Sequence, residues 1–169
     1  MLSTIIKHII TSQVMVYTIR CVLGFLIGYG LMLQFPKYEL FWALLSIILV
    51  ISPEGKDSRR LTIERVKSNL IGSVVGLGCH FTHATNLSIL IIGIVVTISI
   101  CYLFKVMNMS RVAIVAFLIV MLQSHTLNET IAPLIRFATV AFGCFVGLAV
   151  TVFTSIIIQK LKKQYHIET

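Results

Sequence analysis

The chain has 169 residues, of which 57% are apolar and only 12% are charged, and its mean hydropathy is +0.98. Soluble domains carry about a quarter charged residues, so this composition excludes a water-soluble globular protein and indicates several membrane spans in the lipid bilayer. The net charge of +8 is typical of basic cytoplasmic loops, and we expect no nucleic-acid partner. The apolar runs are continuous rather than alternating, so we expect an all-α fold.

The first half of the chain contains three apolar segments. Residues 1–13 are amphipathic and are expected to lie at the membrane interface. A first span is expected over about 14–33, followed by a short run over 39–52. About 14 helical residues cover roughly 21 Å, which is less than the roughly 30 Å core of a bilayer. After a polar loop at 53–67, a third span is expected over 67–83.

The second half repeats this order of long, short and long segments. A fourth span is expected over 87–104, and a short fifth run over 112–123. A polar loop at 124–130 separates this run from the longest one, at 131–158. Residues 159–169 then form a basic tail, which leaves a transmembrane domain of six helices.

The basic residues indicate the topology of this domain, which covers residues 14–158. Six spans place both termini on one side, and twelve of the 14 Lys and Arg residues fall on that side. Only Lys37 and Arg136 fall on the other side. The positive-inside rule therefore predicts a multi-pass protein of the cell inner membrane with both termini in the cytoplasm.

One sequence pattern, R-x(6)-G-x(3)-G, occurs twice at an offset of 71 residues. A shift of 71 also superimposes the short run 39–52 on 110–123, and residues 14–34 on 85–105. Each half would hold three spans, an odd number, so the halves would have opposite orientations. We therefore expect a 3+3 inverted repeat, an arrangement found in many transporters. The two copies of the pattern are Arg65–Gly72–Gly76 and Arg136–Gly143–Gly147.

Arginines are the strongest candidates for function. Arg136 lies inside an apolar run, where an ionisable side chain is costly and usually faces a cavity, although it could instead reach the membrane surface. Arg65 and Arg20 lie at the inner ends of spans, where they would attract a substrate or only anchor the helix. Asp and Glu are confined to loops and span ends, which favours an anionic substrate over a cation.

The glycine pairs indicate close helix packing, and the histidines raise the hypothesis of a metal site. Gly72 with Gly76, and Gly143 with Gly147, allow close approach of helix backbones within the protomer or across a dimer. A third alternative is an intramembrane enzyme with a metal held by histidines. We expect no metal, because loop histidines without a role are commoner, and no motif for a cofactor or an enzyme is present. The histidines concerned are His80, His83 and His125.

Several short motifs resemble the fusaric acid resistance (FUSC) family, which includes aromatic acid exporters and is similar to the plant aluminium-activated malate transporters. The resemblance covers about residues 14–158 and implies a six-span domain that transports small organic anions, as an exporter or channel subunit. Larger family members carry two such blocks, so a single block implies a homodimer. The matching residues are Tyr17–Arg20, Phe41–Leu45, Ser52–Pro53, Arg65 with Gly72 and Gly76, and Arg136 with Gly143.

The chain also departs from the pattern of this family at three places. Ser68 and Asn69 stand where the family carries Gly-Thr, Thr139 and Val140 replace Asp-Thr, and Ser52 replaces a glutamine. We expect these departures to concern the identity of the substrate and the coupling of transport, and not the six-span framework. The resemblance implies a substrate path with Arg20, Arg65, Asn69, Arg136 and Thr139. The alternative function is a non-transporting membrane scaffold or accessory subunit.

Overall fold

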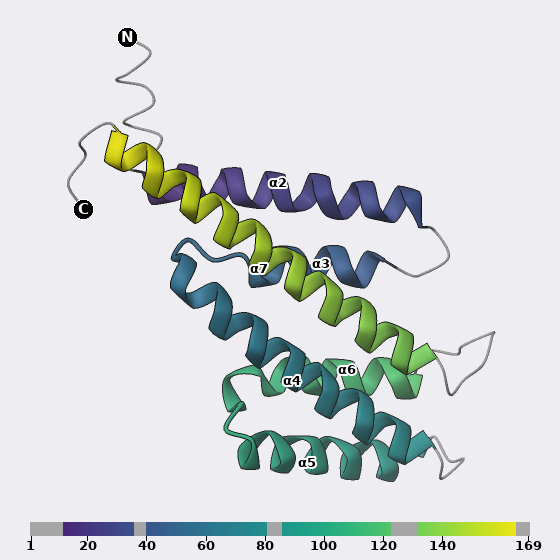
Figure 1. The fold of residues 1–169 in the computed structure, drawn as a ribbon. Coiled ribbons are helices and arrows are strands. Elements are labelled where there is room, and N and C mark those ends of the chain that lie inside the picture. The colour runs from purple at the N-terminus through teal and green to yellow at the C-terminus, as the bar shows by residue number, and fades with distance from the viewer. Residues whose placement is uncertain (1–11, 36–39, 81–85, 123–131, 165–169) are drawn as a thin grey trace. The chain divides into compact units, whose positions relative to one another are not determined.

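The computed structural model describes residues 12–35, 40–80, 86–122 and 132–164. Within these ranges the chain forms six α-helices, α2 to α7, and one 3-10 turn, η2, and no β-strand (Figure 1). This confirms the predicted all-α fold class. The expected interfacial segment at 1–13 lies almost wholly outside the described residues.

Two of the helices are long and apolar enough to cross a bilayer. They are α2, Gln13–Gln34, and the stretch Pro133–Lys163 of α7. Three apolar helices are shorter, namely α3 at Phe41–Val50, α5 at Leu87–Leu103, and the segment Met107–Leu122 that contains α6. Length and composition thus support two spans among the described residues, and the arrangement of six spans stays a prediction.

The two short apolar runs both form short helices. With 10 residues, α3 is about 15 Å long, and α6, Ser110–Leu122, has 13 residues. α3 ends because Ile51 is extended, with ψ at 122°, and because the ring of Pro53 disfavours helical backbone at the residue before it. The Ser52 N–H then donates to Ser58 Oγ at 3.0 Å, which ties the end of α3 to the next helix.

The predicted polar loop at 53–67 is wrong for most of its length, because α4 begins at Gly55 and runs to His80. This stretch is rich in Lys, Arg and Glu, which are good helix formers. Asp57 lies in the first turn, where a negative charge stabilises the helix N-terminus. Charged residues here cover one side of a helix, and polarity alone does not distinguish such a side from a loop.

The last helix, α7, spans Ala132–Gln164 and therefore extends beyond the apolar run at 131–158. Its final turn carries Lys162 and Lys163, whose positive charges interact favourably with the helix C-terminus. The beginning of the expected basic tail is consequently helical.

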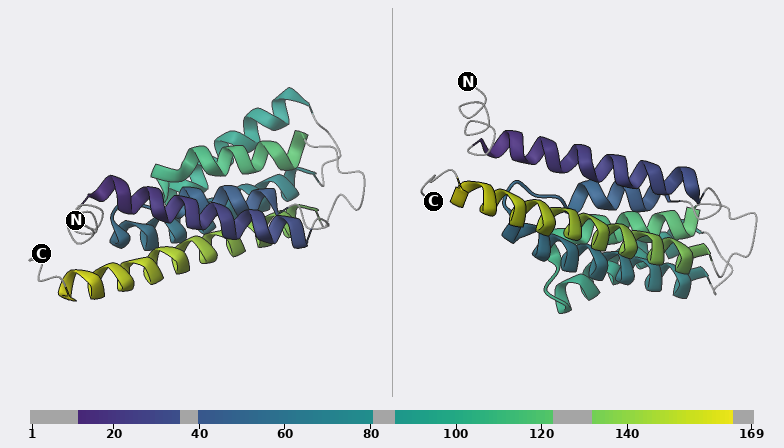
Figure 2. Two further views of the ribbon diagram at one scale, coloured as in Figure 1. Left: turned by 90° about the horizontal axis from the view of Figure 1, so that it is seen from above. Right: turned by 45° about the horizontal axis from the view of Figure 1, so that its top comes forward.

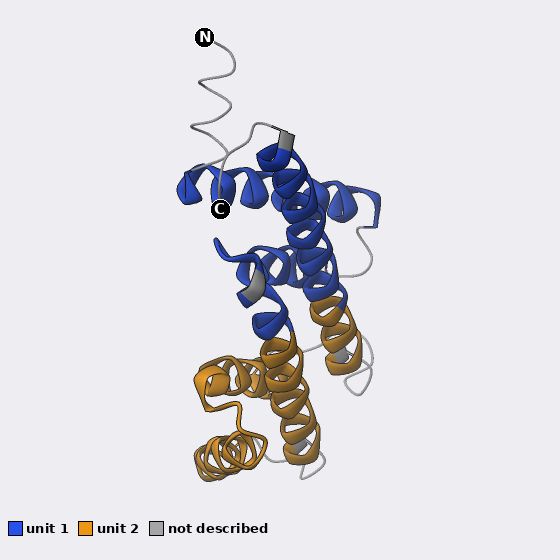
Figure 3. Cartoon of the chain, turned by 60° about the vertical axis from the view of Figure 1, so that its left-hand side comes forward, with its two compact units in different colours: residues 1–62, 142–169 blue, residues 63–141 orange. Residues whose placement is uncertain are grey.

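The chain divides into two compact units (Figure 3). Unit 1 contains residues 1–62 and 142–169, and unit 2 contains residues 63–141. The boundaries fall inside α4 and α7, so each of these helices contributes one part to each unit. In unit 1, α2 packs along α3 (Figures 1 and 2). In unit 2, α5 packs along α6, and η2, Met107–Met109, connects them.

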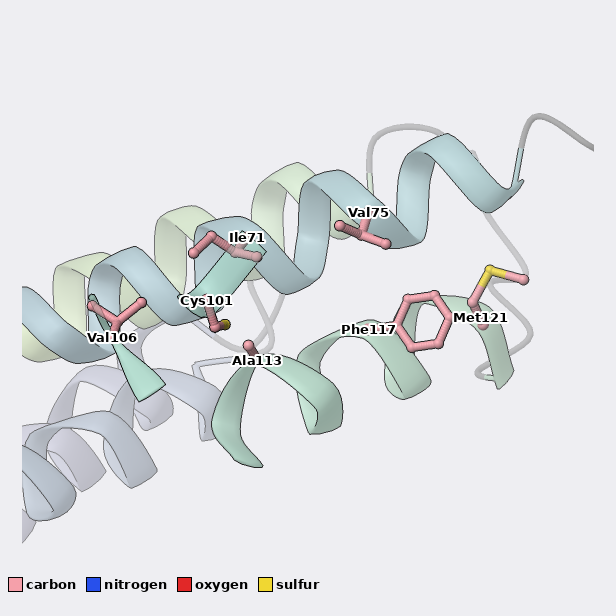
Figure 4. Close-up of a cluster of buried hydrophobic side chains, with 7 residues drawn as sticks. All are labelled: Ile71, Val75, Cys101, Val106, Ala113, Phe117 and Met121. Carbon is pink, nitrogen blue, oxygen red and sulfur yellow. The ribbon is translucent and has the colours of Figure 1, made fainter. Parts of the chain in front are cut away.

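Unit 2 has an apolar core built from α4, α5 and α6 (Figure 4). α5 ends in a Schellman motif, in which Lys105 adopts φ 56° and the Val106 N–H donates to the Cys101 carbonyl at 3.0 Å. This turn returns Val106 to the core beside Cys101. The cluster consists of Ile71, Val75, Cys101, Val106, Ala113, Phe117 and Met121. A smaller cluster in unit 1 contains Ile47, Ile51 and Val150.

Candidate functional site

Large apolar side chains are exposed along α2, α5 and α7, as Leu26, Leu87 and Phe153 illustrate. Most of the buried polar side chains that the structure describes lie on α4 and α7. Many large apolar side chains on the surface, together with polar side chains among the buried ones, suit a protein that lies in a bilayer. The buried set is Ser58, Thr62, Ser68, Asn69 and Ser73 on α4, and Arg136, Thr139, Thr151 and Thr154 on α7.

The polar side chains of α4 form a stripe along one face of the helix. The stripe consists of Ser58, Thr62, Arg65, Asn69 and Ser73, with spacings of four, three, four and four residues. Arg65 is half-buried, and the other four side chains are buried. Two of these residues, Arg65 and Asn69, were placed on the substrate path from the sequence. Ser73 was missed, although its position one turn after Asn69 was a usable signal.

In unit 2, the first glycine pair brings α4 against the backbone of α6. A Cβ atom at Gly72 would lie 2.7 Å from Ala116 Cβ and would also meet the Ala113 carbonyl oxygen. A Cβ atom at Gly76 would lie 2.7 Å from Val120 Cγ1. Atoms this close must move apart, so only glycine fits here without a shift of one helix. This geometry supports the packing role expected for Gly72 and Gly76.

In unit 1, the second glycine pair meets the other short helix in the same way. A Cβ atom at Gly143 would lie 2.7 Å from Ala43 Cα and would also meet the Ala43 carbonyl oxygen. A Cβ atom at Gly147 would lie 2.8 Å from the Ile47 carbonyl oxygen. Each glycine pair therefore faces the backbone of a short helix within its own unit.

Arg136 is buried in unit 2, with 5% of its surface exposed. Its Nη1 donates to the Ala116 carbonyl oxygen at 3.4 Å. A snorkelling arginine would instead extend to the surface. The Thr139 hydroxyl donates to the Arg136 carbonyl at 2.9 Å, and the Ser68 hydroxyl donates to the Arg65 carbonyl at 3.1 Å. The two copies of the sequence pattern thus share a hydroxyl three residues after the arginine.

Arg136 and Gly72 of α4 meet the same turn of α6. Ala116 accepts the hydrogen bond from Arg136, and the same residue lies against Gly72. Asn69 and Ser73 flank Gly72 along α4. Arg136 and Gly72 therefore contact the same residue of α6, and the two buried polar residues Asn69 and Ser73 are near Gly72 in the sequence of α4.

Asn69 and Ser73 lack hydrogen-bond partners for two of their polar atoms among the described residues. The atoms are Asn69 Nδ2 and Ser73 Oγ, both of them buried. Only 3% of Asn69 and 4% of Ser73 is exposed. A buried polar group without a hydrogen-bond partner destabilises the fold by about 1–3 kcal/mol. A water or a ligand group that forms hydrogen bonds with these two atoms would therefore bind favourably.

Arg20 belongs to unit 1, whereas Arg65 and Arg136 belong to unit 2. Arg20 is 4% exposed, and its guanidinium donates to neutral acceptors from two other segments. Nη1 donates to the carbonyls of Ser52 and Pro53, both at 3.0 Å. Nε donates to Thr154 Oγ1 at 3.1 Å, and Nη2 donates to Ser155 Oγ at 2.8 Å. Arg20 thereby connects α2, the link after α3, and α7.

α2 also carries two packing glycines that the sequence reasoning left unused. Its buried residues are Arg20, Gly24 and Gly28, which lie one turn apart on one face. A Cβ atom at Gly24 would lie 2.6 Å from Ile51 Cδ1, and one at Gly28 would lie 2.9 Å from Leu44 Cδ1. The spacing Arg-x(3)-Gly-x(3)-Gly was the signal that could have identified this face.

The neighbouring carboxylate on α4 lies off the stripe. Glu64 Oε2 is buried, but Glu64 is seven residues from Ile71 and shares its face of the helix, which carries the apolar core. His83 and His125 lie outside the described residues, so the metal hypothesis is not tested. Within the described ranges, no three His, Cys, Asp or Glu residues gather as metal ligands would.

Comparison with known proteins gives one match. The chain matches the model of the family described as fusaric acid resistance protein-like over residues 22–150. No significant match was found among curated proteins or among solved structures.

Proposed function

From the premise that the chain belongs to the fusaric acid resistance protein-like family, a family of membrane transport proteins, we propose that it transports small organic anions. The observation that carries this proposal is that three side chains of unit 2 with hydrogen-bond donors are buried, namely Arg136, Asn69 and Ser73. A positive charge and neutral donors in a buried environment favour an anion over a cation. Carboxylic or aromatic acids are the substrate class we propose, moved by an exporter or channel subunit.

We further propose that the chain crosses the inner membrane six times as a 3+3 inverted repeat. The matched contacts of the two glycine pairs, each against a short helix, support this arrangement. Helices interrupted or shortened at matching repeat positions often surround the substrate site near the membrane midplane. The distribution of Lys and Arg supports cytoplasmic termini, and we propose that the protein is a homodimer.

The substrate path proposed here runs through unit 2. Arg65 and Arg136 attract the anion, and Asn69 and Thr139 contribute polar groups near them. Arg20 has a different environment, because its donors are engaged by backbone carbonyls and hydroxyls of unit 1. We therefore propose that Arg20 mainly stabilises the protein.

The test is anion flux in proteoliposomes that contain the purified full chain. Arg136→Ala should lower benzoate flux by about tenfold or more, because a buried charge interacts with an anion by several kcal/mol. Arg136→Lys should restore part of the flux, since it keeps the charge. Arg111→Ala is the matched control, because Arg111 is exposed on α6 and should leave flux unchanged.

Two outcomes would contradict the proposal. If Arg136→Ala elutes as a well-folded protein and carries benzoate as fast as the wild type, Arg136 is not on the path. If the wild-type protein carries no anion at all, the non-transporting scaffold or accessory subunit becomes the better description.

A further inference from the structure

The starting observation is a pair of buried polar side chains on consecutive turns of α4. Asn69 Nδ2 and Ser73 Oγ are both inaccessible, and neither has a hydrogen-bond partner among the described residues. Their neighbours differ in this respect. Ser68 Oγ donates to the Arg65 carbonyl, and Thr62 Oγ1 donates to the Ser58 carbonyl at 2.8 Å. Among the described Ser, Thr and Asn side chains of the stripe, the buried atoms without a partner are therefore confined to Asn69 and Ser73.

The spacing of the pair fits a ligand with two oxygen acceptors. Residues four apart on a helix have Cβ atoms about 5–6 Å apart. Hydrogen bonds of about 2.7–3.0 Å from an amide and a hydroxyl can therefore reach the two oxygens of one carboxylate. Gly72, between the two residues, packs against Ala116 and holds this turn of α4 in place.

The charge around the pair also favours an oxyanion. The guanidinium of Arg136 donates to Ala116, which adjoins Gly72, and a guanidinium has donors but no acceptor. An amide N–H₂ and a hydroxyl add directional donors without adding charge. The charge of Arg136 attracts any small anion, whereas two fixed donors favour an anion with oxygens at a matching separation.

We propose that Asn69 and Ser73 form a carboxylate-binding subsite that selects carboxylates over halides. This inference rests on the proposed anion transport and names the residues that determine its selectivity. Arg136 supplies the attraction common to all anions, and the pair on α4 supplies the discrimination.

The experiment compares benzoate and chloride flux through the reconstituted full chain. Ser73→Ala and Asn69→Leu should each lower the ratio of benzoate to chloride flux by about fivefold, the factor expected for one neutral hydrogen bond. The ratio is the readout, because both residues lie on the proposed path and their replacement also affects the absolute flux. Ser46→Ala is the matched control, because Ser46 is buried in unit 1 and its hydroxyl already donates to the Trp42 carbonyl at 2.7 Å. This control should leave the ratio unchanged.

Thermal unfolding supplies a second measurement that does not depend on transport. Ser73→Ala removes a buried atom without a partner, so its Tm without ligand should equal or exceed that of the wild type. Benzoate should raise the Tm of the wild type, and this shift should be smaller in Ser73→Ala at the same benzoate concentration. If the Ser73 hydroxyl served only to stabilise the fold, Ser73→Ala would instead lower the Tm in the absence of benzoate.

The results separate the two proposals. An unchanged flux ratio together with a retained benzoate shift would overturn the subsite and leave water as the partner of the pair. Absence of flux with a benzoate shift that Ser73→Ala reduces would refute transport and support the subsite. Absence of both flux and shift in the wild type would overturn the two proposals together.

Discussion

Arg20 shows how a buried charge is accommodated by neutral groups. Its guanidinium donates to the carbonyls of Ser52 and Pro53 and to the hydroxyls of Thr154 and Ser155. The two carbonyls follow the end of α3, where the extended backbone before Pro53 interrupts the helical hydrogen bonds. Arg20 thus satisfies acceptors that the break in the helix leaves available.

We predict that Arg20→Leu lowers the free energy of unfolding by about 2–4 kcal/mol, because it leaves several buried acceptors without donors. Arg20→Lys should lower it less, since a lysine keeps the charge but has a single nitrogen. Thermal and denaturant unfolding in detergent measure both effects. Arg111→Leu, at an exposed site, is the control. Equal stability of Arg20→Leu and the wild type would refute this connecting role.

At the scale of helices, two contacts between backbones organise the units. α4 approaches α6 in unit 2 at Gly72 and Gly76, and α7 approaches α3 in unit 1 at Gly143 and Gly147. Inside a bilayer the hydrophobic effect does not drive helices together, so close packing at small residues contributes a large share of their association. The second helix in each contact is one of the two short ones.

The two kinds of glycine on α4 allow a matched comparison. Gly72→Ala should lower the free energy of unfolding by about 1–3 kcal/mol, because the new methyl group would overlap the backbone of α6. Gly78→Ala should raise it by about 0.5–1 kcal/mol, because no atom lies within 4 Å and alanine favours the helix. Equilibrium unfolding in detergent measures both. Equal effects of the two substitutions would show that the close contact does not control stability.

At the scale of the whole molecule, the proposed inverted topology makes a prediction about sidedness. In a cysteine-free background, Lys105→Cys should react with an impermeant thiol reagent only from the cytoplasmic side, and Lys37→Cys only from outside. The physical reason is the positive-inside rule, which places the Lys- and Arg-rich links in the cytoplasm. Labelling of intact cells and of inverted vesicles distinguishes the sides. Reaction of both positions from the same side would rule out six spans with this orientation.

Local features of the sequence predicted the helical fold class and both short helices. The apolar composition excludes a water-soluble surface. Pro53 ends α3 through a local effect of its ring, which does not depend on what the helix packs against. The prediction of a loop at 53–67 was wrong for an equally local reason, since its charged residues are compatible both with a loop and with the solvated side of a helix. The spacing of Ser58, Thr62 and Asn69 showed the buried side of α4 only once the helix was known.

The sequence alone determined that each Gly pair lies on one face of a helix, because residues four apart share a face in any α-helix. Tertiary structure decided what each member of the repeated Arg and Gly pattern contacts. Arg20 pairs with Thr154, which lies 134 positions away, and no local periodicity encodes such a contact. The same holds for Arg136 with Ala116, and for the absence of a protein partner at Ser73 Oγ among the described residues. Burial and hydrogen-bond satisfaction depend on which segments meet, and only the packed chain determines that.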